Sequence, residues 1–248
     1  MTFLDSVWNL FTSNWEVFLR GAYTAFLLAI IGTILGALIG FFIGIMHTIP
    51  QRKKSAKTFL LKIVNFILTA YVEIFRGTPM MVQAMIVFYG LVYLGIDIDR
   101  FVAASIVISL NTGAYMAEYV RGGIVSVDKG QFEAAQAVGM NHVQTMIYVV
   151  LPQVARNILP ATGNQFVMNI KDSSVLSAIS VVELFFTANS VAGSNYKYIE
   201  AFFIATILYF IMTFVVTRFL LLFEKKMDGP DSYKVELITG NKLERDGE

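Results

Sequence analysis

The chain has 248 residues, of which 56% are hydrophobic and only 15% charged, and its mean hydropathy is +0.64. A soluble domain carries about 25% charged residues, and one soluble core of this size cannot hide so much apolar surface, so we expect an integral membrane protein. The net charge of +1 gives no reason to expect a nucleic acid partner. Cysteine is absent and only two histidines occur, which excludes disulfides and argues against a metal site.

The N-terminal region predicts an interfacial helix followed by a membrane span. Residues 1–20 mix Trp8 and Trp15 with polar side chains, which is typical of a helix lying in the membrane interface. Residues 21–49 carry no charge and are long enough to cross the bilayer. This span has a glycine at every fourth position, at Gly32, Gly36, Gly40 and Gly44. Glycine is common in membrane helices, but the strict register favours a close contact with another helix.

The next segment sets the orientation and predicts two more spans. A basic run at 52–54 follows the first span and only Arg20 precedes it, which places the loop 50–62 in the cytoplasm and the N-terminus outside. Residues 63–94 predict a second span, one long helix kinked or opened near Gly77 and Pro79. A third span is expected at 101–119.

The segment 121–153 is more polar and is expected to be a cytoplasmic loop containing two short helices. Residues 131–138 are good helix formers, and Gly139 is placed to end that helix in a left-handed conformation. Asn141 can cap a second helix over 142–150, and Pro152 is expected to limit its continuation.

The remaining sequence predicts two further spans and a tail. The fourth span is expected at 159–182, an external loop rich in small and polar residues at 187–197, and the fifth span at 198–223. Residues 227–248 form a polar cytoplasmic tail in this interpretation. The predicted fold class is therefore an all-α membrane protein with one transmembrane domain over 21–226, five transmembrane helices, the N-terminus outside and the C-terminus inside.

Four ordered motifs resemble those of a known family. Glu133, Ala134, Ala135, Gly139, Leu151 and Pro152 occupy the positions of the EAA loop found in the membrane subunits of ABC importers. Residues 75–79 with Gln83 resemble the FRGTP…Q signature of the polar amino acid permeases. Residues 114–118 with 121–124 resemble the AYxAE…RGGI segment of that subfamily, and residues 151–175 resemble its LPQ…LP…N…KDSS run. The resemblance covers residues 15–226.

The resemblance implies a type I ABC importer permease in a bacterial plasma membrane, with no catalytic residues of its own. The chain has no GxxxxGK[ST] loop for ATP phosphates, and the family places ATP and Mg²⁺ on a separate ATPase subunit, so no bound cofactor is expected here. The implied partners are the ATPase, an extracytoplasmic solute-binding protein, a second permease subunit in a homo- or heterodimer, membrane lipid and an amino acid substrate. The EAA loop would be the element that contacts the ATPase.

Polar residues within the spans are expensive and are candidates for the substrate pathway. Glu73 and Arg76 stand three apart, as do Glu118 and Arg121, so each pair can share a helix face. For Glu118 and Arg121 a structural or ATPase-facing role is favoured, whereas Glu73 and Arg76 are left open between packing and the pathway. Further pathway candidates are Thr78, Gln83, Asn164, Lys171, Asp172, Ser173 and Ser174. The last four could engage a zwitterionic substrate or one another.

Two other functions compete with this hypothesis. A secondary transporter coupled to H⁺ or Na⁺ could use Glu73, Asp172 or Glu183, but the chain has no inverted repeat and does carry an EAA loop. A membrane assembly or sensor subunit without transport activity is the second alternative.

Overall fold

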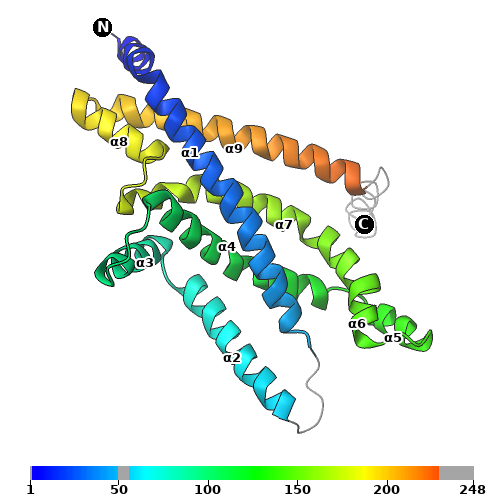
Figure 1. The fold of residues 1–248 in the computed structure, drawn as a ribbon. Helices are drawn as coiled ribbons and strands as arrows, with labels where there is room; N and C mark the ends of the chain where they lie inside the picture. Colours follow the sequence, from blue (N-terminus) through cyan, green and yellow to red (C-terminus); the bar gives the residue numbers. More distant parts are fainter. Residues whose placement is uncertain (1, 50–55, 229–248) are drawn as a thin grey trace, which may run out of the picture.

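The computed structural model describes residues 2–49 and 56–228, and over these ranges the chain is helical with no strand (Figure 1). The predicted basic run at 52–54 and most of the predicted tail lie outside the described residues. The elements in chain order are α1 (Phe3–Met46), α2 (Ala56–Gly77), α3 (Met80–Tyr93), α4 (Arg100–Val125), α5 (Lys129–Ala137), α6 (His142–Thr145), the π-helix η1 (Met146–Val150), α7 (Leu151–Asp172), the 3₁₀-helix η2 (Ser173–Ile179), α8 (Leu184–Asn195) and α9 (Tyr198–Asp228).

The described helices include four that are long and apolar enough to cross a membrane: α1, α2 from Thr58, α4, and α9 as far as Lys226. The run His142–Ile179 and α8 are together also long and apolar enough to cross a membrane, but they bend by 55° at a short break. Counted as one span, this pair brings the number to five. The predicted all-helical membrane architecture is confirmed, with four or five candidate spans.

The first helix runs without a break through the predicted boundary between the interfacial helix and the first span. α1 is a single helix of 44 residues, about 66 Å long at 1.5 Å per residue. Gly21, at the predicted boundary, lies inside the helix. A side chain at this glycine would come within 3.0 Å of the backbone of Leu184, so the glycine allows α8 to approach α1 closely. The helix therefore continues through the predicted boundary.

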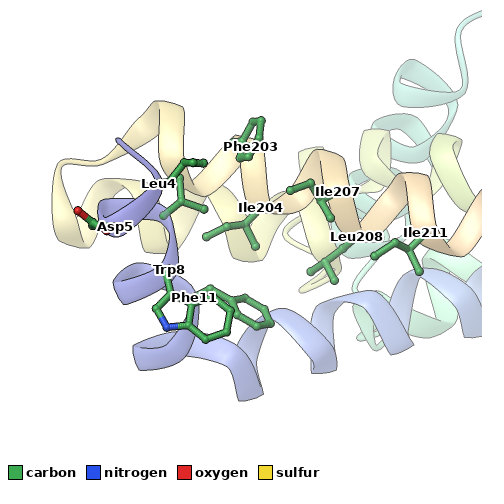
Figure 2. Close-up of a pocket in the computed structure, with 10 residues that line it drawn as sticks. Leu4, Asp5, Trp8, Phe11, Phe203, Ile204, Ile207, Leu208 and Ile211 are labelled. Atoms are coloured by element: carbon green, nitrogen blue, oxygen red, sulfur yellow. The ribbon is translucent and has the colours of Figure 1, made fainter. Parts of the chain in front are cut away.

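The first turns of α1 bend away from the rest of the helix and pack against α9 (Figures 1 and 2). The rings of Phe3 and Phe203 meet edge to face with centroids 5.6 Å apart, and Ser6 Oγ donates a hydrogen bond of 3.0 Å to Glu200. Between the two helices, an apolar groove of about 610 Å³ stays open, lined by residues that include Trp8 and Ile207 (Figure 2).

The glycine register of α1 makes the close helix contact that the sequence predicts. The four glycines face α4 one after another, and their partners on α4 also recur at every fourth position: Ile108, Thr112, Met116 and Val120. A Cβ atom on Gly36 would lie 2.5 Å from the side chain of Thr112 and 3.0 Å from the backbone nitrogen of Gly113. Only glycine permits this approach, and α1 and α4 form the central pair of the fold.

The predicted long helix over 63–94 is in fact two helices, α2 and α3. The chain leaves the helical conformation at Pro79, which has φ −65° and ψ 135° and begins α3. Proline cannot donate the hydrogen bond that would continue α2, and its ring disfavours a helical conformation at Thr78. The break lies where the sequence predicts a kinked or opened helix, and of these two forms the structure has the opened one.

The fourth predicted span has different bounds and composition. α7 begins at Leu151, eight residues before the predicted start, and gives way to the 3₁₀-helix η2 at Ser173. Pro152 does not end the helix, because the π-helix η1 shifts the hydrogen-bond register just before it and the Leu151 N–H bonds to the Met146 carbonyl. The Gln153 side chain then donates to the Val149 carbonyl at 2.8 Å.

The predicted external loop at 187–197 is mostly the helix α8. Its small residues do not mark a loop; Ala188 and Ala192 are fully buried where α8 packs against α1 and α9. The third and fifth predicted spans are also longer than expected, because α4 continues to Val125 and α9 to Asp228.

Candidate coupling loop and transport pathway

The loop between α4 and α7 is built around the short helix α5. Asp128 caps its N-terminus by accepting a hydrogen bond from the Gly130 N–H at 2.6 Å. At the other end, Gly139 has φ +81°, as the sequence predicts, and its N–H bonds to the Gln136 carbonyl. The Met140 N–H bonds to the Ala135 carbonyl, which completes a Schellman motif. Both ends of α5 are thus fixed by local hydrogen bonds.

One face of α5 holds it against the transmembrane helices. Ala135 is 4% exposed, and the half-buried Phe132 packs into an apolar cluster that joins the end of α4 to η1 and α7. Leu151 is half-buried in the same cluster, whereas Pro152 is exposed. The two alanines of the EAA motif therefore differ, because only Ala135 lies in the close contact and Ala134 faces outward.

The opposite face of α5 is open. The Glu133 carboxylate is exposed and belongs to none of the three ion pairs found in residues 2–49 and 56–228. Four large apolar side chains of the same loop are also exposed, at Val138, Val143, Ile147 and Tyr148. An exposed charge beside exposed apolar side chains, on a rigid support, is typical of a protein interface. Sequence reasoning missed these four residues because they lie outside the family motif.

The second short helix of the loop begins as predicted. The Asn141 side chain accepts a hydrogen bond from the Gln144 N–H at 3.0 Å, and the Gln144 side chain accepts one from the Asn141 N–H at 2.9 Å. This capping box fixes the start of α6, which runs through η1 into α7. The helical run from α6 to α7 is therefore continuous, and the turn at Gly139 separates α5 from it.

The sequence spacing allows one charge pair on α2 and one on α4, and the structure contains only the pair on α4. Arg121 binds Glu118 through two nitrogens, with the closest at 2.8 Å, so the pair predicted within α4 is confirmed. Arg76 does not pair with Glu73; it reaches across to Glu118 at 3.8 Å and lies over the Tyr115 ring at 5.5 Å. The side chain of Glu73 is exposed. The packing of α2 on α4 therefore determines the partner of Arg76, although Glu73 stands only three positions away.

Gln83 and Thr78 bind one another at the α2–α3 break. The Gln83 amide nitrogen lies within 3.0 Å of the carbonyls of Phe75 and Thr78 and of the Thr78 hydroxyl, and Gln83 is 7% exposed. Asn111 of α4 donates to the Gln83 oxygen at 3.0 Å. These bonds satisfy the backbone carbonyls left free where α2 ends, so Gln83 supports the broken helix instead of presenting a free polar group.

The candidates at the end of α7 divide into buried and accessible side chains. Ser173 is fully buried and its hydroxyl donates to the Ile170 carbonyl at 2.8 Å. Lys171 and Asn164 are exposed and seven residues apart, which places them on one face of α7, while Asp172 and Ser174 are half-buried. No ion pair within the described ranges involves Lys171 or Asp172.

A buried polar network ties α1, α4 and α7 together, and the sequence gives little sign of it. Asn169 donates to Thr33 at 2.9 Å and accepts hydrogen bonds from Thr112 and Gln165 at 3.1 and 3.2 Å. The side chains of Asn169 and Thr112 are at most 2% exposed. Asn169 therefore fixes the packing of three helices. Of the two asparagines Asn164 and Asn169 on α7, only Asn164 is accessible.

Glu183 is a second buried polar residue, at the break between η2 and α8. Its carboxylate caps α8 by accepting hydrogen bonds from the N–H groups of Phe185 and Phe186 at 2.9 and 2.8 Å. It also accepts a bond from the Tyr209 hydroxyl of α9 at 2.6 Å, and it is 0% exposed. A glutamate just before an apolar run could have suggested this capping role.

A polar hollow of about 520 Å³ lies at the end of α4 that is distant from α5. It is lined by the α3–α4 connection, including Asp97 and Arg100, and by Ser180, which ends η2 with φ +61°. Asp99 is occupied in capping α4 through the N–H groups of Phe101 and Val102. The exposed α5 surface and this hollow thus mark opposite ends of the central helices.

Comparison with known proteins identifies this arrangement. The profile of the family described as binding-protein-dependent transport system inner membrane component matches residues 55–229. The chain is 32% identical over 222 residues to the glutamine transport system permease protein GlnP of Escherichia coli (strain K12), covering 89% of this chain and 97% of that one. It is 33% identical over 223 residues to the L-cystine transport system permease protein TcyB of Bacillus subtilis (strain 168), covering 89% and 91%.

Solved structures give the same result. A crystal structure of an amino acid ABC transporter with histidines matches with a TM-score of 0.79 and 34% identity, covering 91% of this chain and 99% of that one. An inward-facing structure of the MetNI methionine ABC transporter matches with a TM-score of 0.66 and 18% identity, over 84% and 96% of the two chains, and supports the fold alone.

Proposed function

Because the chain belongs to the family of inner membrane components of binding-protein-dependent transport systems, we propose that it is the permease subunit of an ATP-driven ABC importer for polar amino acids. The observation that carries this proposal is the loop that holds α5, a rigidly capped helix with an exposed Glu133, followed by exposed apolar side chains on α6 and η1. Such a surface suits a contact with a separate ATPase subunit.

The proposed topology has five spans, with the N-terminus outside and the C-terminus in the cytoplasm. The fourth of these spans is the run through α7 and η2, continued by α8 after the bend, and α9 is the fifth. The basic residues Lys225 and Lys226 at the end of α9 support a cytoplasmic end there. In this orientation α5 lies in the cytoplasm and the polar hollow with Asp97 and Arg100 faces the binding protein outside.

The chain performs no bond chemistry in this proposal. ATP and Mg²⁺ are bound by the ATPase, and the chain pairs with a second permease subunit, identical or related, because five helices are too few to enclose a pathway. The amino acid is delivered by the binding protein. The glutamine and L-cystine permeases to which the chain is similar support a polar amino acid as substrate.

Transport follows from moving α5. ATP binding draws the two ATPases together, and α5 transmits that movement to α4 and η1 through Phe132 and the apolar cluster into which it packs. α4 moves with α1, because their glycine contact leaves no space for sliding. The α2–α3 break and the 55° bend before α8 are the points where the fold can open, so the pathway alternates between outward and inward states.

The pathway in this proposal passes the accessible polar side chains near the two breaks. Glu73, Arg76 and Thr78 lie at the end of α2, and Asn164, Lys171 and Asp172 lie on α7. Opposite charges on two elements suit the ammonium and carboxylate groups of an amino acid. Gln83 and Ser173 contribute by supporting the breaks.

The ion-coupled secondary transporter considered from the sequence is not supported. The family assignment points to ATP-driven transport. In addition, the buried Glu183 carboxylate accepts hydrogen bonds from two backbone N–H groups and Tyr209, so it acts as the cap of α8.

Reconstitution tests the proposal. The chain is inserted into liposomes with its ATPase and binding protein, and uptake of radiolabelled amino acids is measured with ATP inside. We expect uptake that requires ATP and the binding protein and that persists when an uncoupler dissipates ion gradients. Uptake that is abolished by the uncoupler and indifferent to ATP would refute it.

A further inference from the structure

We propose that the polar hollow at the start of α4 is where the solute-binding protein docks, and that it accepts a basic side chain of that partner. The hollow has a volume of about 520 Å³, and Asp97, Asp99 and Arg100 are the charged residues that line it. The inference rests on the proposed function, which supplies the binding protein and turns the hollow toward it. It adds the residues that the partner contacts and the charge that the partner brings.

The hollow is a fixed part of the fold. It is bordered by α1, by the α3–α4 connection and by the corner between η2 and α8, which lies beside the start of α4 (Figure 1). At its base, Phe88 and Val181 are buried in the same apolar cluster as Ala103 of α4. The Ser180 N–H bonds to the Ser177 carbonyl at 2.8 Å and holds the corner in place. The hollow therefore forms without a partner.

The charges around the hollow favour a basic partner. Asp97 and Arg100 stand three positions apart, yet neither belongs to any of the ion pairs that the described residues form. One oxygen of Asp99 caps α4 by accepting hydrogen bonds from two backbone N–H groups. Two acids and one base leave the lining with a net charge of −1. On α1, Glu16 and Arg20 pair with each other at 4.0 Å, so they add no net charge. The lining therefore attracts a lysine or arginine of a partner.

The exposure of these charges indicates a protein partner instead of the free amino acid. Asp97, Asp99 and Arg100 are all exposed. A site for a small molecule encloses most of its ligand. At a protein interface, by contrast, charged side chains at the rim stay in contact with water, speed association and exclude wrong partners. The hollow has the properties of such a rim.

Helix α4 connects the hollow to the coupling loop. Arg100 begins the helix and Val125 ends it about 39 Å away, at 1.5 Å per residue, just before α5. The glycine contact with α1 holds α4 along much of this length. Docking at the hollow therefore acts on the same helix whose other end leads to α5. One rigid element thus links contact with the binding protein to ATP hydrolysis.

ATP hydrolysis by the complete transporter tests the docking site. The complex with its ATPase is placed in lipid nanodiscs, which leave both faces accessible, and hydrolysis is measured against the concentration of amino-acid-loaded binding protein. We expect Asp97→Lys to raise the half-saturating concentration by about tenfold or more at about 0.05 M salt, because it replaces attraction by repulsion. At about 0.5 M salt the difference from the unmodified complex should shrink to about threefold or less, since the charges are screened.

Matched variants separate the hollow from the general charge of the outer face. Glu16→Lys makes the same reversal on the exposed surface of α1 and should change the half-saturating concentration by less than about twofold. Asp97→Asn should raise this concentration by a smaller factor than Asp97→Lys. Val182→Trp narrows the hollow without altering its charge and should raise the concentration by a similar factor at both salt concentrations. Size-exclusion chromatography establishes that each variant still assembles.

The outcomes distinguish this inference from the proposed function. Hydrolysis that the binding protein does not stimulate in the unmodified complex would refute both. Normal stimulation of the unmodified complex, combined with equal responses of Asp97→Lys and Glu16→Lys, would overturn the docking site alone. A response of Asp97→Lys that salt leaves unchanged would do the same.

Discussion

The guanidinium of Arg76 on α2 lies 3.8 Å from the Glu118 carboxylate on α4, although Glu73 is available on its own helix one turn away. Glu118 also binds Arg121, so one carboxylate joins the end of α2 near the break to the last turns of α4 near α5. This places an ion pair on the route between the coupling loop and the candidate pathway.

The pairing of Arg76 is testable by double-mutant cycles. Melting temperatures of the purified chain are compared for Arg76→Gln, Glu118→Gln and the double variant. We expect the two changes to be non-additive, with a coupling of about 0.5–1 kcal/mol, because the side chain of Arg76 is 42% exposed and solvent weakens the pair. The same cycle with Glu73→Gln and Arg76→Gln should be additive, and the reverse pattern would contradict the assignment.

The glycine contact between α1 and α4 predicts opposite effects for two alanine substitutions. Gly36→Ala places a Cβ atom 2.5 Å from Thr112 and should destabilise the chain by about 1–3 kcal/mol through overpacking. Gly122→Ala, on α4, meets no atom within 4 Å and should stabilise the helix by up to about 1 kcal/mol. Thermal unfolding in detergent measures both. Equal melting temperatures would mean that α1 and α4 do not pack at this glycine.

Two asparagines on α7 provide a matched pair for the buried network. Asn169→Ala removes a group that bonds Thr33, Thr112 and Gln165, and the unsatisfied partners should cost about 1–3 kcal/mol of stability. Asn164→Ala, five residues earlier and exposed, should leave the melting temperature nearly unchanged. If both variants melt alike, the network does not hold the three helices together.

The pathway proposal predicts a loss of transport without a loss of assembly at Asp172. Asp172→Asn should lower ATP-driven uptake by about tenfold, because the variant lacks the carboxylate charge that would face the substrate ammonium. A tenfold loss is the equivalent of one contact of ~1.4 kcal/mol. Co-purification with the ATPase should be unaffected. Glu16→Gln makes the same change of charge on the exposed surface of α1 and serves as the control. Unchanged uptake, or failure to assemble, would remove Asp172 from the pathway.

Local patterns predicted the parts of this fold that local interactions determine. The left-handed Gly139, the Asn141 cap and the glycine register each depend on residues a few positions apart, and all three are confirmed. The register also predicted a close contact, although its partner helix could not be named from one sequence.

The features that sequence reasoning missed depend on contacts between distant segments. The segment containing Ala188 and Ala192 resembled a loop because its residues are small. In the structure both alanines are buried where α8 packs against α1 and α9, a contact between distant segments that the local pattern does not show. Likewise, the spacing of Glu73 and Arg76 allowed a pair that α4 replaces with Glu118. The buried role of Asn169 requires Thr33, which is 136 positions away in sequence.

Coupling through α5 is the central claim, and Gly139 allows a direct test of it. A side chain there would meet no atom within 4 Å, so the effect of a substitution comes from the backbone alone. Valine disfavours φ +81° by about 1 kcal/mol or more, whereas asparagine tolerates this conformation. Gly139→Val should therefore displace α5, and Gly139→Asn should keep it in place.

The most direct measurement is substrate-stimulated ATP hydrolysis beside uptake, in liposomes that contain the chain, its ATPase and its binding protein. We predict that Gly139→Val and Glu133→Lys abolish both activities while the chain still inserts in the membrane. Glu133→Ala should have a milder effect, and Gly139→Asn should remain close to the unmodified chain. Full stimulation of ATP hydrolysis in both Gly139→Val and Glu133→Lys would contradict the account, because α5 would then not be the coupling element.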